Sequence, residues 1–293
     1  MSTDLTLLSL IAITLFAATV NGALGYGFSS LTVPVALLSY TSRLINPALV
    51  LVEVVLNSYV VFINRESLPR VWKRTLPILI GLVPGVLVGS AILSHVAPGT
   101  IKVITYTVLL PLILLQASGF RRYIHSERAI GVPFGTGLGV LYSVTTISGP
   151  PLALLFNNQG YVRQDFRAGL ALVRIVESTL TAVAYYFLGL YSLESTQLLW
   201  AILPSVVIGI PLGAFLIQRI EAETFRRICM SFDAWVVGFG LSRMLIEIGV
   251  LGSPSAYTVL AAAALIDLCL LYRFFKQRAS GAPAYAIGSP SFH

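Results

Sequence analysis

The chain has 293 residues, of which 56% are hydrophobic and 11% are charged, and its mean hydropathy is +0.86. Soluble domains carry about 25% charged residues. A core of this size cannot bury so much apolar surface, which excludes a soluble globular protein. Each spanning helix needs about 20 apolar residues and a connection, so there is room for at most roughly nine or ten passes. The composition predicts an all-α polytopic membrane protein without a separate soluble domain.

The net charge of +7 indicates orientation in a membrane and not a nucleic-acid partner. Lys and Arg are scattered over short loops, and the sequence contains neither a basic run nor an interleaved aromatic platform for bases. Basic loops are typical of the cytoplasmic side of a membrane protein. Here they lie at 64–74, 120–128, 159–167 and 219–227. We therefore predict a multi-pass protein of the cytoplasmic (inner) membrane with its C-terminus in the cytoplasm.

Seven apolar segments have the length of single spans, and two longer ones do not. The single spans are predicted at 46–63, 75–93, 99–119, 167–190, 196–218, 224–248 and 255–275. Segments 5–40 and 129–158 are interrupted at 21–27 and 143–151 by Gly, Ser, Thr, Asn and Pro. With the basic loops in the cytoplasm, 129–158 begins and ends on the same side and is predicted to be a re-entrant broken hairpin. By analogy we interpret 5–40 as a second hairpin.

An internal repeat accompanies these two hairpins. Residues 49–55 match 170–176, residues 34–38 match 151–155, and two glycines at 85 and 89 fall on those at 209 and 213. The sequence predicts repeat 1 over 1–119 and repeat 2 over 129–248, each a hairpin followed by three spans. An odd number of spans inverts the second unit, which is typical of secondary transporters. The final span, 255–275, and a disordered cytoplasmic tail, 276–293, follow.

The two breaks are the predicted substrate site. Unwound backbone at membrane depth is tolerated only where it lines a cavity or is buried in protein, and the half-helix that follows each break directs its N-terminus inward, which suits an anion. The candidate substrate-binding residues are Asn21, Gly25, Tyr26, Ser29, Ser30, Ser143, Thr145, Thr146, Ser148, Gly149 and Arg174. The alternative is that the glycines only permit close helix packing.

Ionisable residues within the spans are expected to have a function or a charged partner, because a charge at the helix centre costs at least about 2.5–3.5 kcal/mol. Glu53 and Arg174 occupy matching positions of the two repeats and are predicted to face each other. Arg174 then contributes positive charge to the anion site, and Glu53 or Glu177 carries a coupling proton. The alternative is a structural ion pair that clamps the two halves. Supporting polar residues lie one turn away at Asn57 and Ser178.

Two further acids are less informative. Asp233 lies in the middle of a span without a counterpart in the first repeat, and Asp267 has no obvious partner. The histidines lie in loops or the tail, and both cysteines lie inside apolar segments, so the sequence predicts no metal site and no cofactor. A Ser–His catalytic dyad within the membrane is excluded for the same reason, and the protein is not expected to be an enzyme.

These residues resemble the TauE/SafE sulfite exporter family, also called the 4-toluene sulfonate uptake permease family. The resemblance rests on the glycine-rich break before Val33-Pro34, on Gly139 with the later run 148–153, and on the two-unit plan over roughly 8–248. Ala23 and Tyr26 stand where family members often have further glycines. The resemblance implies movement of sulfite or organosulfonates across the cytoplasmic membrane.

The predicted function is therefore a secondary transporter that exports a small sulfur-containing anion by alternating access around a midplane site. The expected partners are that anion, the lipid bilayer and, for a coupled carrier, protons; a homo-oligomer is compatible with the sequence. Two alternatives are an anion channel, which would use the same helix dipoles, and an intramembrane enzyme.

Overall fold

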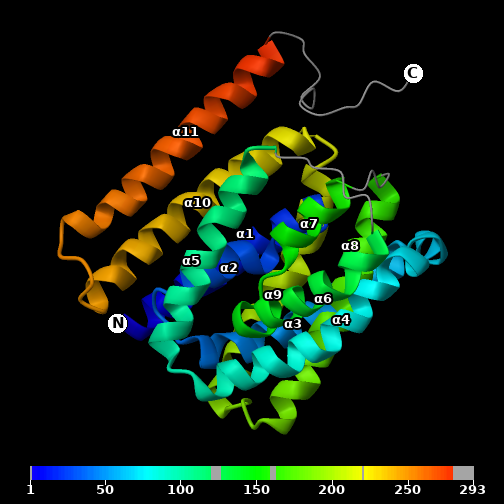
Figure 1. Cartoon of the computed structure of the whole chain (residues 1–293), viewed down its shortest axis with the longest axis horizontal. Coiled ribbons are helices and arrows are strands. Elements are labelled where there is room, and N and C mark those ends of the chain that lie inside the picture. The colour runs from blue at the N-terminus through cyan, green and yellow to red at the C-terminus, as the bar shows by residue number, and fades with distance from the viewer. Residues whose placement is uncertain (1, 120–126, 159–162, 220, 280–293) are drawn as a thin grey trace.

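The computed structural model describes residues 2–119, 127–158, 163–219 and 221–279. All regular structure in these ranges is helical (Figure 1). The helices are α1 (Ser2–Leu24), α2 (Phe28–Ala36), α3 (Ser42–Ile63), η1 (Arg65–Ser67), α4 (Leu68–His95), α5 (Pro98–Ala117), α6 (Glu127–Thr145), α7 (Gly149–Asn158), α8 (Arg163–Phe187), α9 (Leu193–Leu216), α10 (Ala222–Glu247), η2 (Ser255–Tyr257) and α11 (Thr258–Ala279).

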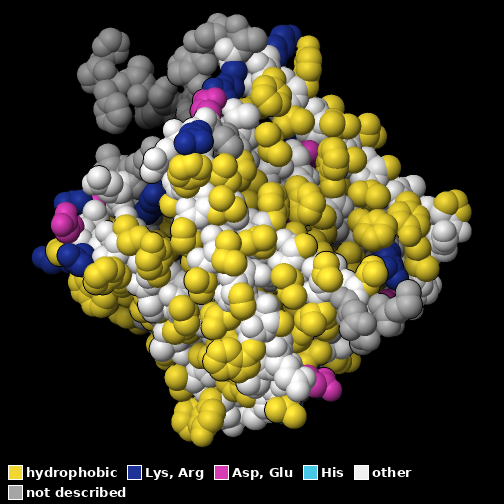
Figure 2. Space-filling model, turned by 180° about the vertical axis from the view of Figure 1, so that it is seen from behind, with side chains coloured by type: hydrophobic (Ala, Val, Ile, Leu, Met, Phe, Trp, Pro, Cys, Tyr) yellow, Lys and Arg dark blue, Asp and Glu magenta, His cyan; other side chains and the backbone are white. Residues whose placement is uncertain are grey.

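The helices and the surface are those of a multi-pass membrane protein. Eight helical stretches of the described chain are long and apolar enough to cross a bilayer. Hydrophobic side chains cover most of the face seen in Figure 2, while Lys and Arg side chains lie toward its edges. Large apolar side chains such as Phe187 and Leu193 are 80% and 76% exposed, which water would penalise and lipid favours. The predicted all-α polytopic class is confirmed.

Both interrupted segments are broken helices, as predicted, but each break is short. Residues 25–27 separate α1 from α2, and residues 146–148 separate α6 from α7. Residues 21–24 and 143–145, expected in the breaks, continue the preceding helices instead. Ser29 and Ser30 also lie in a helix, at the start of α2. Helix α1 has 23 residues, enough to cross a bilayer alone, so it is longer than the expected half-helix.

The first break depends on glycine for its conformation. Gly25 and Gly27 have φ angles of 84° and 107°, which L side chains rarely adopt. The second break places Thr146 at φ 57°. A non-glycine residue in the left-handed region is held there only by its surroundings. These glycines therefore serve the break itself and not helix packing.

Other glycines bring the two halves of the chain into close contact. Helix α4 packs along α6, and α9 packs along α1. A Cβ atom on Gly85 would lie 2.2 Å from the Thr136 carbonyl oxygen, and one on Gly213 would lie 1.9 Å from that of Thr19. Both of these helix pairs thus use glycine at their crossing. The match of 34–38 with 151–155 is out of register, because Pro34 lies late in α2 whereas α7 has its Pro–Pro pair in the first turn.

The Gly213→Ala variant is expected to lower the melting temperature in detergent, because the new methyl group pushes α9 away from α1. Overpacking of this kind costs about 1–3 kcal/mol. The matched control is Gly99→Ala, where a Cβ atom would meet nothing within 4 Å. Equal melting temperatures for the two variants would show that the α1–α9 crossing tolerates a wider spacing.

Except for α11, the helices that correspond to the predicted single spans start earlier in the chain than predicted, and several loop charges belong to helices. The basic residues near 65–74 lie in η1 and the first turns of α4, and Arg167 lies in α8. Arg43, which precedes an apolar run, donates to the carbonyl oxygens of Leu93 (2.9 Å), Ser94 (2.7 Å) and Val96 (2.9 Å). It therefore satisfies carbonyl groups that α4 leaves free at its C-terminal end. Part of the predicted basic loops, at 120–126 and 159–162, lies outside the described residues.

Helix α11 lies along α10 at the edge of the bundle (Figure 1). A buried ion pair joins them, with Arg227 Nη2 and Asp267 Oδ1 2.8 Å apart, so Arg227 is not the loop charge expected from 219–227. At the helix end Arg278 pairs with Glu221, and this hydrogen bond lowers the pKa of that carboxyl. Because α11 runs to Ala279, residues 276–279 are helical and not tail; the rest of the tail lies outside the described residues.

Candidate functional site

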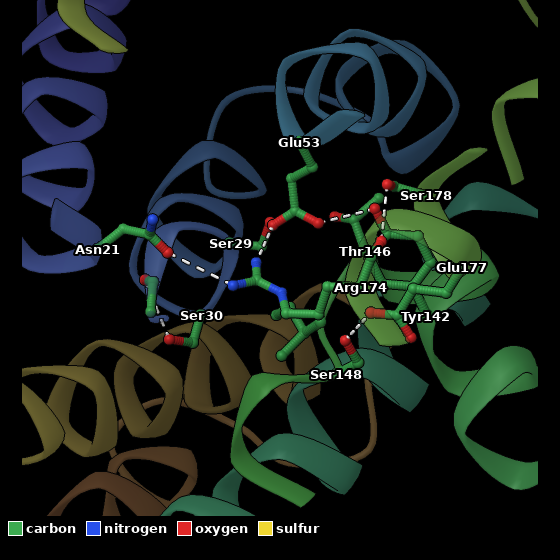
Figure 3. A network of polar contacts seen from close by, with 12 residues as sticks. Asn21, Ser29, Ser30, Glu53, Tyr142, Thr146, Ser148, Arg174, Glu177 and Ser178 are labelled. Atoms are coloured by element: carbon green, nitrogen blue, oxygen red, sulfur yellow. Dashed lines mark hydrogen bonds and ion pairs between the residues drawn. The ribbon is translucent and has the colours of Figure 1, made fainter. Parts of the chain in front are cut away.

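Helices α3 and α8 cross near their middles and bring the predicted Glu53–Arg174 pair together (Figure 3). Arg174 Nη2 lies 2.6 Å from Glu53 Oε1, and the two residues are 2% and 0% exposed. The predicted contact between Glu53 and Arg174 is therefore present. The pair is closed to solvent in this conformation, so its energetics are those of buried charges.

Glu53 is surrounded by donors from three other helices. Ser29 of α2 donates to Oε1 at 2.6 Å, and Tyr142 of α6 donates to Oε2 at 2.7 Å. Together with Arg174 of α8, these donors satisfy both carboxylate oxygens. The sequence analysis missed Tyr142, because a tyrosine in an apolar helix gives no signal of its own. The one available clue to a role at the site is that Tyr142 lies four residues before Thr146 of the second break.

Glu177 makes the corresponding contact at the second break. Ser148, directly before α7, donates its hydroxyl hydrogen to Glu177 Oε1. Glu177 is fully buried, and its Oε2 has no hydrogen-bond partner. It lies one turn along α8 from Arg174, so the two side chains belong to the same cluster.

The start of each half-helix thus holds a carboxylate of the protein itself. Glu53 meets Ser29 in the first turn of α2, and Glu177 meets Ser148 at the start of α7. Free backbone N–H groups and the positive end of the helix dipole favour a negative charge at such places. In this conformation the serine at the start of each half-helix therefore binds a carboxyl group supplied by α3 or α8.

Several buried donors around Arg174 have no acceptor. Its Nη1 is 3.4 Å from Asn21 Oδ1, while its Nε has no partner. The amide Nδ2 atoms of Asn21 and Asn57 are also unpartnered and buried. Buried polar groups are normally hydrogen-bonded, so a concentration of unpaired donors is chemically informative. An acceptor-only ligand such as an oxyanion complements it.

Most of the other predicted hydroxyls do not reach the ion pair. Each instead donates to a main-chain carbonyl oxygen of a nearby residue. These residues are Ser30, Ser143, Thr145, Thr146 and Ser178. The expectation that the hydroxyls of both breaks form one donor cluster is therefore wrong for this conformation, since only Ser29 and Ser148 bind carboxylates.

Tyr26 connects the first break to the second. Its ring makes an edge-on contact with Phe166 at 6.5 Å between centroids, and a Cβ atom on Gly149 would lie 3.7 Å from it. Gly25 lies against the aliphatic part of Arg167. Tyr26 also lines a cavity of about 20 Å³ beside the break.

Matching caps close the first helix of each broken pair. Arg167 donates to the Ala23 carbonyl oxygen at 2.6 Å, at the end of α1, and Asn46 donates to the Val144 carbonyl oxygen at 2.8 Å, at the end of α6. Arg167 and Asn46 have the same spacing along the chain as Arg174 and Glu53. The caps satisfy carbonyls that a helix leaves free at its C-terminus. Sequence analysis did not predict them, although both residues precede the charged positions by two turns.

A family model described as Sulfite exporter TauE/SafE matches residues 10–241, which is most of the chain. The chain belongs to the TauE/SafE sulfite exporter family. The resemblance found in the sequence is confirmed, and the protein is a multi-pass member of a family of membrane transporters. No curated protein and no solved structure matches it. In the described part of this family member, no group of three or more His, Cys, Asp or Glu residues is arranged to hold a metal ion.

Proposed function

We propose that the protein is a secondary carrier that exports a small sulfur oxyanion, sulfite or an organosulfonate, across the cytoplasmic membrane. The observation that carries this proposal is the buried cluster at Arg174, where donors without acceptors lie between two half-helix N-termini. A sulfur oxyanion presents several acceptor oxygens and no obligatory donor, so it complements this set. The family name supplies sulfur, which the cluster alone does not specify.

Burial of the cluster supports a carrier over a channel. Arg174 and Glu53 are almost completely shielded from solvent, whereas an open pore would keep its anion-binding donors wet. In a carrier, one repeat moves against the other and opens the same site to each side in turn. The proposed architecture is the inverted pair α1–α5 and α6–α10, supported by the matching packing of α9 on α1 and α4 on α6.

The protein's own carboxylates are proposed to act as competitors of the substrate. Glu53 and Glu177 occupy the starts of α2 and α7 in this conformation. An incoming anion would be repelled by a charged Glu177, and a proton on that side chain would remove the repulsion. Proton uptake at Glu177 and anion binding would then favour each other, so the anion and the proton move in the same direction and transport depends on the pH gradient. Net export then occurs when the outward electrochemical gradient of the anion exceeds the inward gradient of the proton. Arg174 and two hydroxyls already satisfy both carboxylate oxygens of Glu53, so Glu177 is the proposed proton carrier.

The test is flux of sulfite, a small sulfonate and sulfate in proteoliposomes, with and without an imposed pH gradient. We expect saturable flux of sulfite or the sulfonate that increases when the gradient favours proton movement with the anion, and weaker flux of sulfate. Empty liposomes give the background, which matters because neutral forms of sulfite cross lipid. Saturable flux that ignores the gradient would remove the coupling role of Glu177, and absence of flux for all three anions would overturn the substrate.

A further inference from the structure

A second buried carboxylate, outside the Glu53–Arg174 cluster, lies next to the first break. Asp233 is near the middle of α10 and is 7% exposed. Its Oδ1 has no hydrogen-bond partner. Asp267 of α11 is paired with Arg227 of α10. Asp233 has no such partner among the described residues and instead faces a cavity. A buried acid at membrane depth needs a functional or structural reason, and no ion pair of Asp233 supplies one within the described chain.

The cavity has room for one water molecule and polar groups to hold it. Its volume of about 20 Å³ exceeds the roughly 10–15 Å³ that a single water requires. Gln116 of α5 lines it, is 5% exposed, and has an unpartnered Nε2. A water between Gln116 Nε2 and Asp233 Oδ1 would satisfy one free donor and one free acceptor. The lining also includes Tyr26, Gly27 and Ser30 of the first break.

Ser30 bonds to the backbone of the break and lines the same cavity as Asp233. Its hydroxyl donates to the Gly27 carbonyl oxygen at 3.2 Å, and from the wall of this small cavity it can turn toward the Asp233 carboxyl. A hydroxyl has one hydrogen and can serve one acceptor at a time. If Asp233 carries a proton, it donates to Ser30, which then donates to Gly27. If Asp233 is ionised, Ser30 turns toward it and releases the Gly27 carbonyl.

We propose that Asp233 is a second proton-binding site, and that its protonation sets the conformation of the first break through Ser30 and Gly27. Gly27 is the N-cap residue of α2 in the left-handed conformation, and its carbonyl also accepts from the Leu31 N–H at 3.2 Å. Releasing this carbonyl loosens the start of α2, where the neighbouring Ser29 binds Glu53. Each half-helix then has its own titratable acid, Glu177 for α7 and Asp233 for α2.

The groups around Asp233 fit a single titrating site. Arg226 and Cys229 of the same helix line the cavity, and Tyr26 faces it from the break. Arg226 is engaged by Glu223 through an ion pair, and α11 contributes the Asp267 carboxylate that Arg227 neutralises. Helix α5 contributes the uncharged Gln116, and α7 contributes Pro150. Asp233 is therefore the one carboxylate among the described residues that line the cavity.

The first test follows protonation directly and does not depend on transport. Infrared difference spectra of the purified full chain between acid and neutral pH should contain a carboxylic C=O stretching component that Asp233→Asn removes. Two control variants should keep the Asp233 component. Asp267→Asn changes another buried acid of the same bundle, and Glu177→Gln should remove only the component that belongs to Glu177. An unchanged spectrum in Asp233→Asn would overturn the proposal, whatever the outcome of the sulfite flux assay.

The second test follows the break by hydrogen–deuterium exchange at the amides of 25–31. After correction for the intrinsic effect of pH, exchange of this segment in the wild type should be about fivefold slower on the acid side, the size expected for one hydrogen bond. Ser30→Ala should abolish the difference while keeping the infrared component. Ser242→Ala, a buried hydroxyl that bonds only its own helix in α10, should behave as wild type. A pH difference that persists in Ser30→Ala would overturn the relay. This extends the proposed carrier function, since a pH-dependent break is useful whichever anion is carried.

Discussion

Arg174→Gln is expected to abolish sulfite flux in proteoliposomes and to destabilise the protein by about 3–5 kcal/mol, because it leaves Glu53 buried without its counter-charge. Arg174 Nη2 is 2.6 Å from Glu53 Oε1, and neither side chain reaches solvent. Stability is measured as the melting temperature in detergent, and flux is normalised to folded protein in the liposomes. A folded Arg174→Gln protein with wild-type flux would eliminate the substrate role of Arg174.

The double variant Glu53→Gln/Arg174→Gln separates substrate binding from a structural clamp. Removing both charges eliminates the unpaired carboxylate, so much of the lost stability should return. Flux should remain absent, because the anion has lost its positive partner. Recovery of flux together with stability would instead show that the pair only holds α3 and α8 together.

The second buried pair of the bundle provides a matched control. Arg227→Gln/Asp267→Asn removes an ion pair of similar burial between α10 and α11, away from the Glu53–Arg174 cluster. This double variant is expected to keep saturable flux of sulfite. Loss of flux in it would mean that the assay reports general damage to the bundle and not removal of the anion-binding charge.

Glu177→Gln is expected to lose flux driven by a pH gradient while keeping sulfite–sulfite exchange at equal pH. Glutamine has the shape of the protonated acid and still accepts from Ser148, so it mimics the state in which the anion binds, but it releases no proton. Exchange is followed by counterflow of radiolabelled sulfite into liposomes loaded with unlabelled sulfite.

The same variant can contradict the coupling hypothesis in a clear way. Gradient-driven accumulation equal to that of the wild type would show that Glu177 carries no transported proton. Loss of both exchange and driven flux would show instead that its carboxylate is needed for binding. Glu194→Gln, an exposed change at the start of α9, is a control for the loss of one negative charge from the protein.

The sequence by itself determined the class of protein and the position of its unusual features. The shortage of charge and the periodic apolar runs require lipid, whatever the packing. Glycines and prolines in two long runs indicate broken helices, because backbone conformation at these positions is a local property. The Glu53–Arg174 pairing was also accessible, since a charge in a span requires a partner and the internal repeat named one. The family followed from the same motifs and was confirmed.

The tertiary structure decided which polar groups are used and for what. Six candidate hydroxyls at the breaks are equivalent in the sequence, but only Ser29 and Ser148 reach carboxylates, because each of the other four donates to a nearby main-chain carbonyl oxygen. Tyr142 and the cavity at Asp233 arise from contacts between helices far apart in the chain. Local pattern predicts where a helix breaks; only packing determines which side chain faces it.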